Sequence, residues 1–270
     1  MSDRPSQPAR LSIQWQRALT IAVQLAVVVV ANRLAFMDGV LADFSSAFHE
    51  VEVRLFGRGR PIRPELPEEA EEKQSGRSAT GNQLHQGPGG QALGADGVDD
   101  TRRRSEAIWN AIRSMPGFWT TLKPLDPTAV RRIRDEMIRH RWEVFFITQR
   151  PETAGETVQR QTQRWLLSQG FDVPSVLVIG GSRGAAAKAL RLDYHVDDSP
   201  QNCLDVMSEG HAKPILIVPS GNEATARRAR SLGIGVAKSI GEGLDILEQI
   251  SVAGGEPGVL QKLAAAVGWK

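Results

Sequence analysis

The strongest constraint on the fold is a regular alternation of apolar runs and helix-like segments in the C-terminal half of the chain. WEVFFIT, at 142–148, is a nearly continuous apolar run, which is typical of a strand buried on both faces. Four shorter runs follow, separated by segments with helical spacing: SVLVIG, DYHVDD, KPILIV and IGVAKS. This alternation predicts an α/β fold, a Rossmann-like and mostly parallel sheet with helices on both faces.

Capping signals predict where several helices begin and end. DPTAVRRIRDEMIRH begins with Asp126 as the N-cap and has Pro127 in its first turn. Gly170 follows TVQRQTQRWLLSQ as the predicted C′ residue. We also expect helices at SEAIWNAIRSM and at GEGLDILEQI.

The region after the first apolar segment has a different composition. No aromatic residue occurs between Gly57 and Ile108, and the segment is rich in Gly, Gln, Pro and charge. We predict disorder over 57–101, because this composition buries too little apolar surface to offset the cost of ordering. The expected organisation is an apolar N-terminal segment (1–33), a core (34–56 and 115–250), an insert or cap (57–114) and a C-terminal tail (251–270).

Two features bear on location and partners. ALTIAVQLAVVVVA, at 18–31, is similar to a signal or anchor segment, but Gln24 interrupts it and it is shorter than the ~20 apolar residues of a membrane span. We expect a buried helix and a cytoplasmic protein, with a signal or anchor as the open alternative. The net charge of +2 and the interspersed charges argue against nucleic acid as a partner, and we expect no membrane partner. Cys203 is expected to be a buried apolar residue and not a nucleophile.

Polar residues follow the apolar runs where the strands are predicted to end. Asp38 follows LAFM, Thr148 ends EVFFIT, and Asp197 and Asp198 follow YHV. Arg183 lies in GGSRGAAAKALRL, before the acidic pair. Such residues converge beyond the carboxyl ends of parallel strands. Carboxylates hold Mg²⁺ through oxygen, and a hydroxyl and a cation bind phosphoryl oxygens. The pattern predicts a Mg²⁺-dependent phosphate site.

Five motifs in this order carry a resemblance to a known family. They are MDGVLADF, PGFWTTLKPL, FITQRP, GSRGAAAKALRLDYHVDD and HVDDSPQNC. Together they resemble the haloacid dehalogenase (HAD) superfamily, and within it the 5′(3′)-deoxyribonucleotidase-like, cytosolic type C branch. The resemblance covers residues 34–56 and 115–250.

The resemblance implies a phosphomonoester hydrolase that uses Mg²⁺ and acts on a small phosphorylated molecule, such as a nucleoside monophosphate. It implies catalytic roles for Asp38, Thr148 and Arg183, where Arg183 replaces the lysine usual in the branch. Metal ligands would be Asp38, Asp197 and Asp198. A small helical cap would follow the first motif, with Phe118 and Trp119 next to the substrate.

One family residue is missing from the first motif. In the family, an acid two residues before the second acid attacks phosphorus, and the second acid protonates the leaving oxygen and then activates water. Asp38 matches the second acid, and the position of the first is Phe36. Either Phe replaced Asp, or an Asp was lost after Phe36. The alternative function is a non-catalytic HAD-like protein that binds Mg²⁺ and a phosphorylated ligand.

A third function, dinucleotide-binding oxidoreductase, is less well supported. VLVIGGSRGAAAKAL resembles the glycine turn of short-chain dehydrogenases. Those enzymes also use a Tyr-x-x-x-Lys pair. In this chain the residue four positions after Tyr194 is Asp198 and not a lysine.

Overall fold

The computed structural model describes residues 32–36, 39–59, 61–62, 64, 95–253 and 257–269. The described strands are β1 (Arg33–Phe36), β2 (Glu143–Thr148), β3 (Ser175–Val178), β4 (Tyr194–Asp197), β5 (Lys213–Ile217) and β6 (Gly235–Ala237). They pair in parallel in one sheet with the order β3-β2-β1-β4-β5-β6. The predicted α/β class with a parallel sheet is confirmed.

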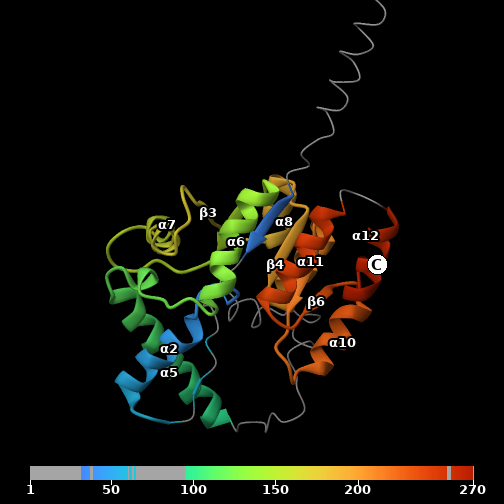
Figure 1. Cartoon of the computed structure of the whole chain (residues 1–270). Helices are drawn as coiled ribbons and strands as arrows, with labels where there is room; N and C mark the ends of the chain where they lie inside the picture. Colours follow the sequence, from blue (N-terminus) through green and yellow to red (C-terminus); the bar gives the residue numbers. More distant parts are fainter. Residues whose placement is uncertain are drawn as a thin grey trace, which may run out of the picture. The chain divides into compact units, whose positions relative to one another are not determined.

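Helices flank this sheet in Figure 1. The described helices are α2 (Phe44–Phe56), α5 (Ala95–Ser114), η1 (Phe118–Thr120), α6 (Pro127–His140), α7 (Val158–Ser168), α8 (Arg183–Leu190), α9 (Pro200–Glu209), α10 (Glu223–Ser231), α11 (Ile240–Val252) and α12 (Pro257–Val267). Within the described part of the chain, no helix combines the length and apolar character that a membrane crossing requires.

The two faces of the sheet are covered by different helices. Successive side chains of a strand point to opposite faces. Phe36 of β1 belongs to an apolar cluster that includes residues of α6, α7 and α11. Its neighbour Ala35 belongs to a second cluster, with Ala187 of α8 and Val206 of α9. The sheet is therefore a buried middle layer, as the apolar character of its strands predicted.

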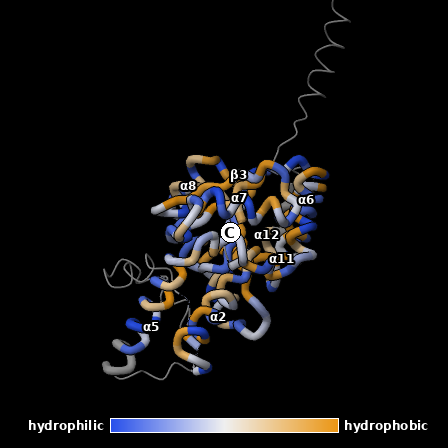
Figure 2. Tube along the Cα trace, turned by 90° about the vertical axis from the view of Figure 1, so that its left-hand side faces the viewer, coloured by the Kyte–Doolittle hydropathy of each residue, from blue (hydrophilic) through white to orange (hydrophobic). Residues whose placement is uncertain are grey.

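Helices α2 and α5 lie side by side, and both are separate from the helices that cover the sheet (Figures 1 and 2). The ring centroids of Phe44 and Phe48 in α2 lie 5.4 and 5.6 Å from that of Trp109 in α5. Glu52 of α2 is 1% exposed and accepts a hydrogen bond from Arg104 Nη2 of α5 at 2.9 Å. Figure 2 shows many hydrophilic residues along α5. Aromatic contacts and a partly buried ion pair thus join this helix pair.

Helix α5 begins earlier than SEAIWNAIRSM predicted. It starts at Ala95 and ends at Ser114. Residues 95–101 therefore belong to this helix, and the disorder expected over 57–101 stays a prediction. Most of the rest of the predicted segment, residues 60, 63 and 65–94, lies outside the described residues, as does 1–31.

The other helix boundaries follow the capping signals. The Asp126 carboxylate accepts hydrogen bonds from the backbone N–H groups of Thr128 and Ala129, at 2.8 and 3.0 Å. Gly170 follows α7 with a φ of +88°. Within the segment expected to be a tail, α12 is followed by Trp269, whose Nε1 donates to the Pro214 carbonyl at 2.7 Å.

Candidate phosphate site at the carboxyl ends of the strands

The register of β1 with its two neighbours places the polar strand ends. The Cα of Phe36 pairs with Phe146 of β2 and with Val196 of β4. Thr148 is therefore two residues beyond the level of Phe36, and Asp197 is one residue beyond it. Strands β2 and β3 lie on one side of β1 and strands β4 to β6 on the other, so the order of the strands reverses at β1. Parallel sheets bind ligands at such a switch point. Thr148 and Asp197 flank this point, while Asp38 lies outside the described residues.

Thr148 is linked to an arginine two residues further along. The Thr148 hydroxyl, in a side chain that is almost fully buried, accepts a hydrogen bond from the Arg150 backbone N–H at 3.2 Å. Arg150 Nη1 donates to Thr162 Oγ1 at 3.1 Å, and Arg150 Cζ lies 4.9 Å from the Trp119 ring centroid. Arg150 is only 5% exposed. A guanidinium and a hydroxyl at a strand end are donors that suit anionic oxygens.

Arg150 is a site residue that the sequence reasoning missed. It lies in FITQRP, the motif that supplied Thr148, but its burial and its contact with Trp119 come from residues distant in sequence. A cation two residues after a strand-end hydroxyl was the only available signal. That spacing alone does not distinguish a buried arginine from a solvated one.

Arg183 is the first residue of α8 and is buried. The Ser182 hydroxyl caps this helix by accepting from the backbone N–H groups of Gly184 and Ala185, at 3.0 and 3.4 Å. A Cβ on Gly184 would lie 2.2 Å from the Asp205 carbonyl oxygen, so α8 and α9 are in close backbone contact there. This contact fixes the start of α8 against the helix that follows Asp197 and Asp198.

Asp197 is fully buried, and both of its carboxylate oxygens accept hydrogen bonds. Oδ1 accepts from the Ser199 backbone N–H at 2.8 Å, and Asn202 Nδ2 lies 3.2 Å from each oxygen. His195 Nε2 lies 3.0 Å from Oδ2. Donors from the strand, the turn and the helix thus hold this carboxylate. Asp197 therefore anchors the turn between β4 and α9.

Asp198 is exposed and lies against the loop that follows β1. A Cβ on Gly39 would lie only 2.3 Å from Asp198 Oδ2 and 2.5 Å from its Oδ1. Gly39 also has a backbone φ of +77°, which residues other than glycine rarely adopt. Glycine is required here for two independent reasons. The Asp198 carboxylate thus lies beside the residue that directly follows Asp38.

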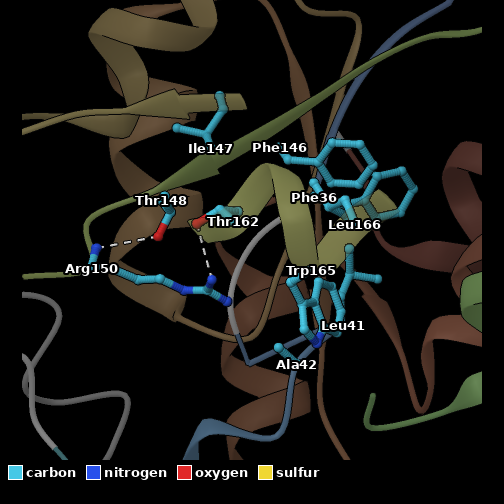
Figure 3. Close-up of a pocket in the computed structure, with 10 residues that line it drawn as sticks. All are labelled: Phe36, Leu41, Ala42, Phe146, Ile147, Thr148, Arg150, Thr162, Trp165 and Leu166. Carbon is cyan, nitrogen blue, oxygen red and sulfur yellow. Dashed lines mark hydrogen bonds between the residues drawn. The ribbon is translucent and has the colours of Figure 1, made fainter. Parts of the chain in front are cut away.

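A cavity of about 20 Å³ lies beside Thr148 and Arg150, on the face of the sheet that Phe36 shares with Phe146. This volume holds roughly one water molecule. Figure 3 shows the Phe36 ring beside Phe146 and Leu166, while Thr148, Arg150 and Thr162 lie on the opposite side of the cavity. The remaining lining residues are Leu41, Ala42, Ile147 and Trp165. A ligand larger than water therefore requires these side chains to move or binds outside the cavity.

Cys203 of α9 is fully buried, as expected. Its burial raises the pKa of the thiol well above the usual value, and the negative charges of Asp197, Asp198 and Asp205 raise this pKa further. A protonated, buried thiol is a poor nucleophile. Cys203 is a core residue that is sensitive to the negative charge around the start of α9.

Phe118 and Trp119 are both buried. Their ring centroids lie 6.5 and 5.5 Å from that of Phe44, within one aromatic group. Trp119 Nε1 donates to the Pro151 carbonyl at 3.0 Å. Trp119 thus connects the α2–α5 pair to Arg150, and contact of either ring with a substrate stays a prediction.

A second group of potential metal ligands lies elsewhere. Among the described residues, Glu136, His140 and Glu248 bring their ligand atoms within 4.8 Å of one another. They belong to the C-terminal half of α6 and to α11, and α6 ends just before β2 begins, so His140 lies at the opposite end of the sheet from Thr148. Arg132 and Arg139 form ion pairs with both acids. This group is a charge network between two helices, and it is no part of the phosphate site.

Comparisons with known proteins add similarity of fold. No protein-family model matches the sequence, and no curated protein matches it significantly. A β-phosphoglucomutase-like structure from Thermotoga maritima is 18% identical and covers 81% of this chain and 99% of its own, with a TM-score of 0.44. A haloacid dehalogenase-like hydrolase from Streptococcus pneumoniae is 11% identical over 80% and 98%, with a TM-score of 0.46. A structure described as a phosphoglycolate phosphatase from Lactobacillus delbrueckii is 12% identical over 83% and 97%, also with a TM-score of 0.46. Similarities at this level assign no function.

Proposed function

We propose that this chain is a HAD-like protein of phosphatase type, which binds Mg²⁺ and a small phosphorylated molecule at the carboxyl edge of its sheet. The nucleoside monophosphates are the ligand class that the sequence resemblance implies. The observation that carries the proposal is that Thr148 and Asp197 end the two strands on either side of β1, at the switch point of the sheet. We expect hydrolysis by the natural chain to be slow, because the first acid of the first motif is missing.

The available side chains suit this role. The Thr148 hydroxyl and the cations of Arg150 and Arg183 would bind phosphoryl oxygens, where negative charge accumulates. Asp38 would act as the acid–base, and Asp38 and Asp198 would hold Mg²⁺. Asp198 fits a hard cation, because it offers carboxylate oxygens, is exposed and lies against Gly39. A bound Mg²⁺ would draw charge from the phosphoryl group.

Asp197 contributes to the same site in a different way. Its oxygens already accept hydrogen bonds from Ser199, Asn202 and His195. These bonds fix the turn that carries Asp198. We therefore assign Asp198 as the ligand that faces solvent and Asp197 as the acid that holds it in place.

The surroundings of Phe36 favour one of the two explanations for the missing acid. Phe36 is 1% exposed and lies level with the apolar residues Phe146 and Val196. In β4 the acid comes one residue later, at Asp197. Phe36 therefore occupies the apolar layer that precedes the polar strand ends. This favours an acid lost after Phe36 over an acid replaced by Phe36.

The test compares hydrolysis by the natural chain with that of a variant in which Asp is inserted between Phe36 and Met37. The measurement is Mg²⁺-dependent release of phosphate from a panel of nucleoside monophosphates. We expect feeble release by the natural chain and a gain of several orders of magnitude on insertion, because a nucleophile opens the covalent route. Insertion of Ala at the same point is the matched control. Asp198→Asn in the Asp-inserted variant should remove the gain.

The alternative, a non-catalytic binding protein, rests on the same missing acid. A binding measurement distinguishes it from the proposed phosphatase. If the natural chain binds Mg²⁺ together with a nucleoside monophosphate, and the Asp insertion adds no hydrolysis, the protein is a binding protein. Robust turnover by the natural chain that survives Asp38→Asn and Asp197→Asn would place the chemistry at another site and overturn the proposal.

A further inference from the structure

A buried histidine lies behind the acidic pair. His195 is fully buried in β4, where its Cα pairs with those of Ala35 in β1 and Pro214 in β5. It points to the same face of the sheet as Asp197, since the two residues are separated by one position in the strand. That face is covered by α8 and α9, through apolar residues such as Ala187 and Val206. An imidazole in this layer is a polar group in apolar surroundings.

The contacts of the ring indicate which nitrogen carries the proton. Nε2 lies 3.0 Å from Asp197 Oδ2, and a carboxylate can only accept, so Nε2 must donate. Nδ1 has no hydrogen-bond partner in the part of the chain that the structure describes. The contact therefore places a hydrogen on Nε2, the ring nitrogen that faces Asp197.

We infer that His195 is a positioning residue for the acidic pair. Its N–H fixes Asp197 from the strand side, while the Ser199 backbone N–H and Asn202 fix it from the turn and the helix. The turn held in this way carries Asp198, the proposed Mg²⁺ ligand. A leucine would fill the strand but would leave the buried Asp197 carboxylate with one donor fewer, so the histidine serves the carboxylate and not the packing of the strand. This inference rests on the proposed function, because it assigns His195 to the metal site.

The test measures Mg²⁺ affinity by titration calorimetry for the natural full-length chain and two variants. His195→Gln keeps a side-chain N–H that can reach Asp197, and His195→Leu removes it while remaining apolar. Loss of a partner that orients a metal ligand typically costs about 10- to 100-fold in affinity. His195 acts on Asp198 through Asp197, so we expect the lower end of this range. We expect this loss for His195→Leu, together with a lower melting temperature in the absence of Mg²⁺, because the buried Asp197 carboxylate loses a donor. His195→Gln should retain affinity within about threefold.

The outcomes separate this inference from the proposed function. Equal Mg²⁺ affinity in the natural chain and in His195→Leu would overturn the positioning role and leave the metal site standing. Absence of Mg²⁺ binding by the natural chain would overturn both. If His195→Leu does not fold, the ¹⁵N shifts of the ring in the natural chain decide. Hydrogen on Nε2 supports the inference, and an Nε2 without hydrogen overturns it.

Discussion

The ends of β1 and β4 differ at the same level of the sheet. Val196 of β4 lies opposite Phe36 of β1 in the register of the sheet, and both residues are apolar and buried. The next residue of β4 is Asp197, held by three donors, whereas the next residue of the β1 sequence is Met37. On β2 the apolar layer is likewise followed by a polar residue, Thr148.

Under the proposed loss of an acid after Phe36, this difference means that the other strand ends can keep their places. The two strands that flank β1 still end in residues suited to a phosphate and its metal. The donors to Asp197 come from His195, Ser199 and Asn202, and none of these bonds involves the side chain at position 36. The proposed loss of an acid from the middle strand would therefore leave the turn after β4 in place.

Phe36→Asp is the most direct test of the difference between the ends of β1 and β4. We expect this substitution to have the largest effect on stability. The side chain at position 36 is 1% exposed and packs beside Phe146 and Leu166. Removing a buried phenylalanine costs about 3–5 kcal/mol, and burying a carboxylate adds to that cost. We expect the variant to be destabilised by at least this amount in urea unfolding. Phe36→Leu, which conserves apolar character, should be affected much less. A stable Phe36→Asp variant with strong phosphatase activity would instead show that Phe replaced the nucleophile.

Arg150 is expected to contribute most among the cations to anion binding. Replacement by Met keeps the apolar part of its contact with Trp119 but removes the charge. Hydrogen bonds to charged groups contribute about 1.5–3 kcal/mol, so we expect phosphate in the presence of Mg²⁺ to bind at least about tenfold more weakly. Arg164→Met is a matched control, because Arg164 is also on the chain after β2 but is exposed and pairs with Glu156. Equal phosphate affinity in both variants would remove Arg150 from the site.

Gly39→Ala tests whether the β1 loop and the β4 turn depend on their close contact. The added Cβ would overlap the Asp198 carboxylate. Gly57 has a similar φ, +74° against +77°, but a Cβ there meets nothing within 4 Å. Both variants should lose about 1 kcal/mol of stability from the positive φ, and only Gly39→Ala should also weaken Mg²⁺ binding. Equal losses of Mg²⁺ affinity would show that the contact with Asp198 is not needed.

The strand ends show what the sequence could and could not predict. The apolar run of β2 and the caps at Asp126 and Gly170 are local patterns, so the sheet and several helix boundaries were predictable. The sequence could not predict that Asp197 is buried while Asp198 is exposed, because this difference depends on donors from α9 and on the approach of Gly39. Arg150 was missed for the same reason, since its burial depends on Thr162 and Trp119.

Cys203 provides the smallest expected effect, and it reports on the charge around the end of β4. Burial and the nearby aspartates raise the pKa of its thiol in the folded protein. The unfolded thiol loses its proton near pH 8.5, while the folded one keeps it. The unfolded state is therefore favoured as pH rises above that value, by about 1 kcal/mol at pH 9.5. Burial and Asp193 also raise the pKa of Tyr194, which adds a loss of stability of the same sign at higher pH.

Urea unfolding at pH 7.5 and 9.5 should show a smaller loss of stability for Cys203→Ala than for the natural chain. Equal losses would mean that the thiol ionises as readily in the folded state, against the burial and charge described for α9.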